Sequence, residues 1–398
     1  MIKNLSIRHI CGYALGVRIL ALVLITILSS YVSTGFYGST YEQDDVRMLA
    51  GAEIYSRTAK SIIDRPALEN AFDVVEPGRI HDEVASMEFD NWFISISMYL
   101  LGNEILVRLL YILCSVFSVK CIYDIGILLY NKQVATLSSI LYALMPYPVI
   151  FSCFLYKDHL YTLVVLLLIR KALKCAGNIH LKDVIFLSFF LFISLWIRSG
   201  LVVLVLFALL IIIYKRGNYT LKLWKIVLFT VVLLSLVSVV TYYSWDIIVK
   251  KITIYIIEYN SAESSIIDYF TIKSPSQIYR YPFSLFFLML QPLGYLIKAG
   301  SWYELACVIN VIGIPLAVGN IYYLFNFKMK KGYFYWLMQL FFLLTVITSL
   351  SIPRHYFYLQ PFIMLFFSVY YLQLRKKFLF NITSLAGILI MLSLFVLM

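Results

Sequence analysis

Two adjacent carboxylates, Asp44 and Asp45, stand a short distance after the first long apolar stretch of the chain. One carboxylate of such a pair can act as a general base and accept a proton from an attacking hydroxyl. The negative charge beside it makes that base stronger. Two carboxylates can also hold a divalent metal such as Mg²⁺ or Mn²⁺ through oxygen ligands. The pair is therefore a candidate catalytic site or metal site, and the structural alternative is an ordinary polar loop.

Three cations stand where apolar stretches meet. Arg198 separates two such stretches, Arg354 precedes His355 between two later ones, and Lys157 lies two residues before His159. A charge at membrane depth is costly and is a functional candidate by default. Arg is well suited to bind an anionic group, with its planar fork and permanent charge. Arg198, Arg354 and Lys157 are therefore candidate binding residues, with His159 and His355 as candidate accessory groups.

Each of these residues also has a structural interpretation. Arg198 could be a helix-end residue whose charge reaches the interface. Arg354 could be an interface anchor, since aromatic residues of the headgroup belt follow it. Lys157 could pair with Asp158, which would then cap the following helix. A histidine without partners, such as His355, is usually structural.

Composition indicates the elements that must position these residues. Of the 398 residues, 62% are hydrophobic and only 14% are charged, whereas a soluble domain is about half apolar and a quarter charged. Many apolar runs approach the ~20 residues that cross a bilayer, and in lipid such runs must be helical. We predict an all-α, polytopic integral membrane protein with about eleven spans. The expected spans are 11–33, 105–130, 134–155, 158–172, 183–197, 199–214, 224–244, 302–325, 333–350, 356–372 and 379–397.

The net charge of +12 does not indicate nucleic-acid binding, because Lys and Arg gather in short clusters between the apolar runs. Such clusters mark the cytoplasmic face of a membrane protein. The N-terminus is therefore predicted to be cytoplasmic, and the protein to be a multi-pass protein of the cell membrane. The six cysteines form no CxxC motif, so we expect free thiols.

The chain reads as a single membrane domain over residues 1–398, with two long outer segments. The first, 34–91, holds 12 acidic and 5 basic residues and contains the acidic pair. The second, 245–301, includes an apolar stretch at 282–297 that is interrupted by prolines. Irregular backbone at membrane depth must be buried in protein or line a cavity. We expect a re-entrant or surface-lying helix pair there.

Several short signals follow one another in a fixed order. They are Asp44-Asp45, Arg47, Met48, Ala50 and Ala52, then Leu101-Gly102-Asn103 with Arg108, Met145-Pro146, Lys157-Asp158 and Arg198. Together they resemble the GT-C superfamily of membrane glycosyltransferases, which includes dolichyl-phosphate-mannosyltransferases and aminoarabinose transferases. The resemblance is clearest over residues 1–215, and Met48 departs from the tyrosine usual in that family.

The resemblance implies a large first extracytoplasmic loop with juxtamembrane helices and an active site on the extracytoplasmic side. It implies transfer of a sugar from a polyprenyl-phosphate-linked donor to a glycan, lipid or protein acceptor, as in polysaccharide biosynthesis of the cell envelope. Asp44, or Asp45, would deprotonate the acceptor hydroxyl. Arg198, Arg354 and Lys157 would stabilise the departing phosphate.

Other functions fit parts of the pattern. An O-antigen or capsule-type polysaccharide polymerase also has many helices, large outer loops and arginines that handle a lipid-linked donor. A transporter or lipid-carrier flippase would use charges inside the membrane and often shows a two-fold repeat, of which we see no sign. A non-catalytic assembly subunit would keep the fold and tolerate loss of the acidic pair. The sequence has no Walker-type nucleotide motif.

Overall fold

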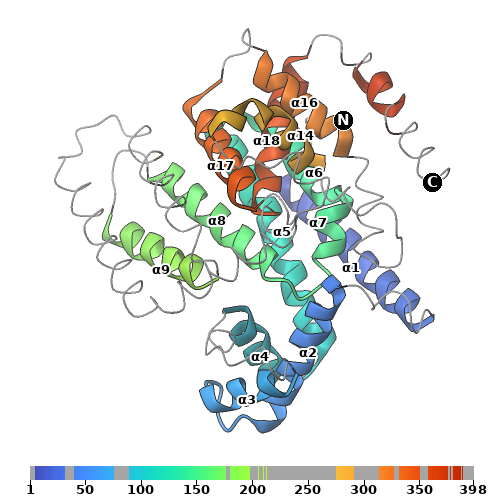
Figure 1. The fold of residues 1–398 in the computed structure, drawn as a ribbon, viewed down its shortest axis with the longest axis vertical. Coiled ribbons are helices and arrows are strands. Elements are labelled where there is room, and N and C mark those ends of the chain that lie inside the picture. Colours follow the sequence, from blue (N-terminus) through green and yellow to red (C-terminus); the bar gives the residue numbers. More distant parts are fainter. Residues whose placement is uncertain are drawn as a thin grey trace.

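The computed structural model describes residues 5–31, 40–75, 89–175, 180–197, 275–290, 313–326, 331–349, 357–374 and 380–386, with a few single positions elsewhere. Within these ranges all regular structure is helical and there is no strand, in agreement with the predicted all-α class (Figure 1). The predicted spans 199–214 and 224–244 lie almost wholly outside the described residues, as does most of the outer segment 245–301.

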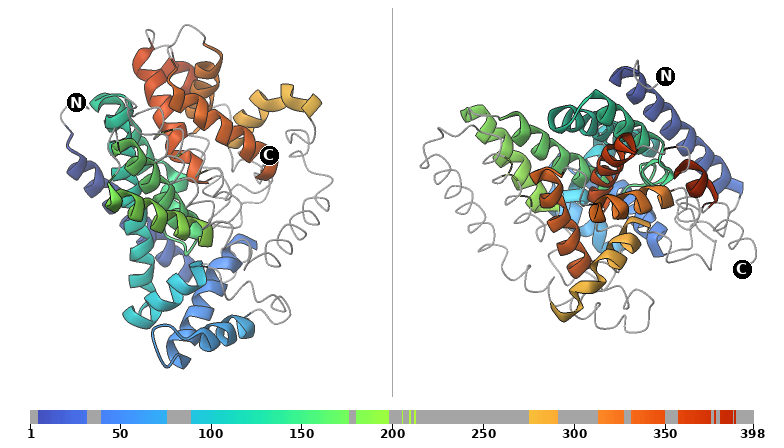
Figure 2. Two further views of the ribbon diagram at one scale, coloured as in Figure 1. Left: turned by 90° about the vertical axis from the view of Figure 1, so that its left-hand side faces the viewer. Right: turned by 90° about the horizontal axis from the view of Figure 1, so that it is seen from above.

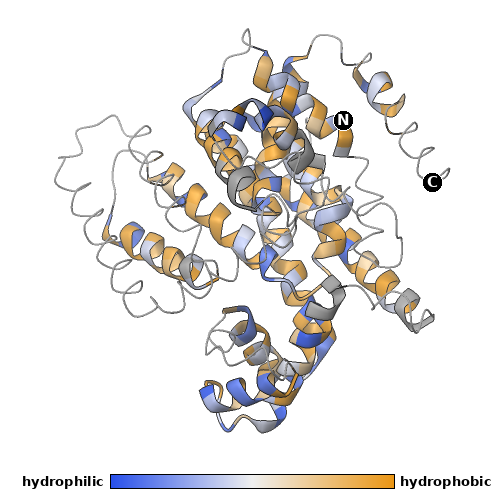
Figure 3. Cartoon of the chain, viewed as in Figure 1, coloured by the Kyte–Doolittle hydropathy of each residue, from blue (hydrophilic) through white to orange (hydrophobic). Residues whose placement is uncertain are grey.

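Two described helices are long and apolar enough to cross a membrane by length and composition. They are α1 (Ile7–Tyr31), which qualifies over Ile7–Ile27, and α5 (Glu104–Leu129). Both coincide with predicted spans, while the total of about eleven spans and the sidedness stay predictions. Hydrophobic residues dominate both helices in Figure 3.

A tight turn sets the start of α5. Gly102 has φ +62°, a backbone conformation that favours glycine. Asn103 follows it, and its side chain accepts a hydrogen bond of 2.8 Å from the backbone N–H of Ile105. This N-cap satisfies one of the free N–H groups at the helix start.

The predicted single span 134–155 is wrong, because the structure divides it into α6 (Lys132–Leu144) and α7 (Pro146–Phe151). Pro146 lacks a backbone N–H and disfavours helical backbone in the residue before it. Met145 accordingly has extended backbone, with ψ 127°, between the two helices. The break therefore follows from a proline already visible in the sequence.

The buried Arg18 of α1 occupies this break. Its Nη1 donates to the carbonyl of Ala143 at 2.9 Å and its Nη2 to that of Tyr142 at 3.4 Å. Its Nε donates to the Ser115 hydroxyl at 2.9 Å. Carbonyls at a helix C-terminus lack intrahelical partners and carry partial negative charge, which suits a cation.

Three helices lie beyond one end of α5, at the bottom of Figure 1: α2 (Thr40–Thr58), α3 (Arg65–Val75) and α4 (Phe89–Leu101). Helices α2 and α3 account for most of the described part of the first outer segment, and Figure 3 shows their many hydrophilic residues. α2 packs against both α3 and α4. The described part of this segment is therefore helical, while its place outside the membrane and beside it stays a prediction.

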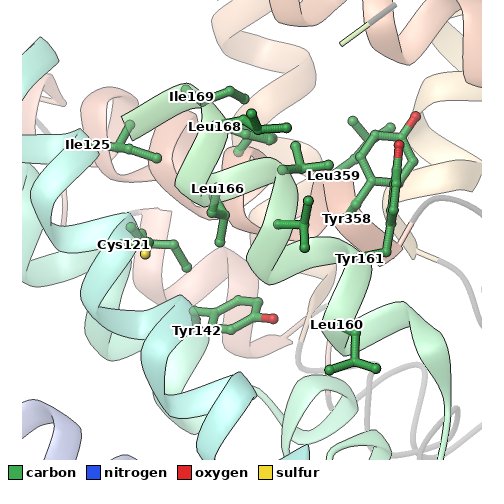
Figure 4. Close-up of a cluster of buried hydrophobic side chains, with 14 of the residues drawn as sticks. Cys121, Ile125, Tyr142, Leu160, Tyr161, Leu166, Leu168, Ile169, Tyr358 and Leu359 are labelled. Atoms are coloured by element: carbon green, nitrogen blue, oxygen red, sulfur yellow. The ribbon is translucent and has the colours of Figure 1, made fainter. Parts of the chain in front are cut away.

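The remaining helices build the bundle around α5 (Figure 2). They are α8 (Lys157–Lys174), α9 (Leu181–Ile197), α14 (Tyr281–Leu290) after the 3₁₀ turn Pro275–Arg280, α16 (Ile314–Phe325), α17 (Tyr333–Ser349) and α18 (Gln360–Gln373). α5 packs against α6 and α8, and α18 packs against α6. Figure 4 shows buried side chains of these helices meeting Tyr358 and Leu359, which precede α18.

Candidate functional site

A buried ion pair joins helix α2 to helix α5. Asp45 of α2 is 1% exposed, and both of its carboxylate oxygens accept hydrogen bonds from Arg108 of α5. The distances are 2.6 Å from Nη2 to Oδ2 and 3.1 Å from Nη1 to Oδ1. This two-pronged geometry is the strongest arrangement for an Arg–carboxylate pair.

Further hydrogen bonds complete the pair. Arg108 donates from Nε to Glu104 at 2.7 Å and from Nη1 to the carbonyl of Cys153 at 2.9 Å. The backbone N–H of Leu155 donates to Oδ1 of Asp45 at 2.6 Å. Buried charges persist only when they are paired and hydrogen-bonded. The network therefore fixes α2 to α5 and to the segment between α7 and α8.

A second ion pair lies at the starts of α4 and α8. Nζ of Lys157 is 3.6 Å from Oδ2 of Asp90, which is 1% exposed. Tyr111 is buried within electrostatic reach of Asp90 and of the Asp45–Arg108 pair. The two pairs therefore occupy one region, which we call the paired-charge site: Asp45, Asp90, Arg108 and Lys157.

Local hydrogen bonds fix the turn that follows α2. The Tyr55 hydroxyl donates to the carbonyl of Ile62 at 2.8 Å and accepts from the N–H of Asp64 at 3.1 Å. The Asp64 carboxylate in turn accepts from the backbone N–H groups of Lys60 at 2.9 Å and Ala67 at 3.2 Å. Those donors lower the pKa of Asp64. The turn between α2 and α3 is thus fixed by local hydrogen bonds.

The structure describes the side chains of only some of the predicted site residues. Asp45 and Lys157 come together in the paired-charge site. Asp44 belongs to α2, but its side chain lies outside what the structure describes, and so do Arg198, Arg354 and His355. The roles predicted for these four residues remain predictions.

His159, two residues after Lys157 in α8, is fully buried. Its ring centroid is 4.6 Å from that of Phe357. The surrounding aromatic cluster comprises Tyr147, Phe151, Phe154, Tyr156 and Phe357. Its accessory role remains a prediction, and the burial shows that His159 is not at the surface of the site.

The structural alternative for Lys157, a pair with Asp158 that caps the next helix, is wrong. Asp158 does not cap α8, because the helix starts at Lys157 and Tyr156 occupies the cap position. Lys157 instead forms an ion pair with Asp90 of another helix. Asp124 of α5 also has its ion-pair partner on another helix, since it bonds Arg170 of α8 at 2.6 Å.

Sequence reasoning gave no chemical role to Arg108 or Asp90. Arg108 was visible as a charge in an apolar stretch, four residues after Glu104, and this spacing brings the two side chains together on one helix face. Nothing in the sequence marks Asp90 as a partner of Lys157, because the two residues lie in different helices.

The described residues give little support to a metal site. They contain no group of three or more His, Cys, Asp or Glu side chains placed to hold one. Asp45 already uses both oxygens on Arg108 and Leu155, so a cation at Asp45 would have to displace those donors. Five of the six cysteines are free thiols, as expected, and Cys307 lies outside the described residues.

Comparison with known proteins gives one family match. The family described as dolichyl-phosphate-mannose-protein mannosyltransferase matches residues 89–245, a range that starts at α4 and includes α5 to α9. No curated protein and no solved structure matches the chain. The matched range contains Asp90, Arg108 and Lys157, three of the four residues of the paired-charge site. Over this range, which is less than half of the chain, the match supports a similarity to the membrane glycosyltransferases of the GT-C superfamily, and the two long apolar helices agree with it.

Proposed function

We propose that the protein transfers a sugar from a polyprenyl-phosphate-linked donor to a glycan, lipid or protein acceptor on the outer face of the cell membrane. The observation that carries the proposal is the family match over residues 89–245. The paired-charge site adds support, because it gathers carboxylates and cations where α2 and α4, in the part of the chain that holds the hydrophilic helices α2 and α3, meet the apolar bundle. A donor with an apolar tail and a charged phosphate needs such a boundary.

In this proposal Asp44 is the general base and Asp45 is a positioning residue. Asp45 is buried, and both of its oxygens are already engaged by Arg108 and Leu155. It is therefore badly placed to accept a proton from a substrate. Asp44, its neighbour at the start of α2, would receive the proton of the acceptor hydroxyl.

The reaction would be a direct displacement at the anomeric carbon. The acceptor oxygen forms a bond to that carbon while the carbon–oxygen bond to the donor phosphate breaks. The electron pair of the broken bond leaves with the phosphate, and preorganised cations stabilise the charge that develops there. We assign that role to Lys157, whose side chain is 27% exposed, together with Arg198 and Arg354.

The test compares three variants, Asp44→Asn, Asp45→Asn and Asp73→Asn, at matched membrane expression. Asp73 is an exposed carboxylate of α3 in the same outer segment, so its variant is the charge-matched control. We expect Asp44→Asn to lose transfer, with one sugar missing from a cell-surface product and the lipid-linked donor accumulating. The Asp73→Asn protein should behave as wild type.

The readouts also separate the alternatives. Full transfer by Asp44→Asn would refute the assignment of the base. A product that shortens from a ladder of repeat units, rather than losing one sugar, would identify a polymerase instead. Unchanged glycans together with altered movement of a substrate across the membrane would identify a transporter. Lys157→Gln should weaken donor binding, seen as a raised donor KM.

A further inference from the structure

A cavity of about 200 Å³ opens at the C-terminal end of α8, where α8 packs against the start of α9. Its lining consists of Leu167, Arg170, Lys171, Lys174 and Phe186. Three of these five side chains are cations, and the other two are apolar. This combination suits a ligand that carries both an anionic group and an apolar part.

The cavity has more cationic side chains than there are carboxylates paired with them. Arg170 contacts Asp124 at 2.6 Å, and Lys171 contacts Asp183 at 2.5 Å. Lys174 is exposed and forms no ion pair within the described part of the chain. Three cations against two carboxylates leave one net positive charge, which a single monoanion would balance.

Arg170, which lines the cavity, has one hydrogen-bond donor without an acceptor in the described part of the chain. Nε of Arg170 is buried and has no hydrogen-bond partner among the described residues. Its Nη2 is already engaged by Asp124. A guanidinium N–H removed from water needs an acceptor, and a phosphate oxygen is the acceptor that an Arg fork binds best.

The cavity lies at the opposite end of α8 from the paired-charge site. Lys157 starts α8 and Lys174 ends it, a rise of ~25 Å at about 1.5 Å per residue. The hydrocarbon core of a bilayer is about 30 Å thick. Helix α8 coincides with the predicted span 158–172, which would place its two ends near opposite faces of the membrane and the cavity near the headgroup level of one face.

An apolar surface continues from the cavity along α9. Ile185, Phe189 and Phe192 are 60%, 57% and 50% exposed on the same helix as Phe186. Exposed side chains of this kind face lipid in a membrane helix. A lipid whose headgroup entered the cavity could lay its acyl chains against them, whereas a free phosphate ion would gain nothing from this surface.

We propose that this cavity binds the phosphate group of an anionic phospholipid from the leaflet opposite to the paired-charge site. The headgroup phosphate accepts hydrogen bonds from Arg170, and the positive charges of Lys171 and Lys174 stabilise its negative charge. Basic pockets between membrane helices bind anionic headgroups in this way. The site is separate from the sugar-transfer chemistry and does not depend on the proposed function.

The test uses the full chain purified in a neutral detergent. Thermal unfolding is followed while phosphatidylglycerol, phosphatidylcholine or inorganic phosphate is added to the wild type, Lys174→Glu and Lys132→Glu. Lys132 is exposed at the start of α6 and does not line the cavity, so its variant controls for the same change of charge. Native mass spectrometry counts the lipids that remain bound.

Phosphatidylglycerol should raise the unfolding temperature of the wild type and of Lys132→Glu, with about one lipid retained. Its apparent affinity for Lys174→Glu should fall about tenfold or more. Phosphatidylcholine and inorganic phosphate should have little effect at equal concentration. The proposal is overturned if phosphatidylcholine stabilises as well as phosphatidylglycerol or if both variants lose the lipid equally. Equal stabilisation by inorganic phosphate would overturn the lipid as the ligand.

Discussion

Substituting Arg108 and substituting Asp45 should lower the free energy of unfolding by unequal amounts. Removing one partner of a buried ion pair costs about 3–5 kcal/mol, because the other charge stays buried. In Arg108→Met, Asp45 keeps only the N–H of Leu155 at 1% side-chain exposure, so we expect about 5 kcal/mol. In Asp45→Leu, Arg108 keeps Glu104 and the Cys153 carbonyl, so we expect about 3 kcal/mol.

The double variant should cost much less than the sum of about 8 kcal/mol. It removes both buried charges and leaves two backbone groups, of Cys153 and Leu155, without partners. An unsatisfied buried group costs about 1–3 kcal/mol, so we expect about 2–6 kcal/mol for the two groups together. The pair would then show a coupling free energy of at least about 2 kcal/mol.

Reversible unfolding in mixed micelles, followed by tryptophan fluorescence, measures these free energies. The pair Arg65–Glu69 of α3 is the matched control, since its contact of 2.7 Å is close to the 2.6 Å of Asp45–Arg108 but its side chains are 56% and 38% exposed. An exposed i,i+4 pair should couple by about 0.3–0.5 kcal/mol. Free energies that add within about 0.5 kcal/mol at Asp45 and Arg108 would refute the account of this network.

Three further predictions concern the surrounding elements. Gly126→Ala should destabilise the protein by about 1–3 kcal/mol, because a Cβ there would lie 2.7 Å from the backbone of Ala135. Gly16→Ala is the control and should not destabilise it, because a Cβ at Gly16 would meet no atom within 4 Å. Tyr55→Phe removes two hydrogen bonds to the following turn and should cost about 1–3 kcal/mol, with faster proteolysis of that turn as the readout. Asp64 has a lowered folded pKa, so its stabilising effect is present above its unfolded pKa of about 3.9 and is lost as pH falls through the folded pKa. Asp64→Asn should therefore flatten the acid limb of a stability–pH curve, and an unchanged limb would contradict this.

The helical class and several helix positions could be predicted from sequence. α1, α5, α8 and α9 each start and end within about four residues of an expected span. A helix in lipid satisfies its backbone by hydrogen bonds within the segment, so local apolar composition is enough to predict it. The break between α6 and α7 was also local, since Pro146 causes it, although the prediction ran one span through it.

The paired-charge site depended on tertiary structure. Asp45 was predicted as functional because of its type and position, yet its partner Arg108 lies 63 residues away. Arg18 was equally visible as a buried charge, but its carbonyl partners lie more than 120 residues along the chain. The sequence determined which residues carry charge and which segments are helical, because both properties are local. Which charges meet was decided by helix packing, because a contact between distant residues depends on how whole helices pack in three dimensions.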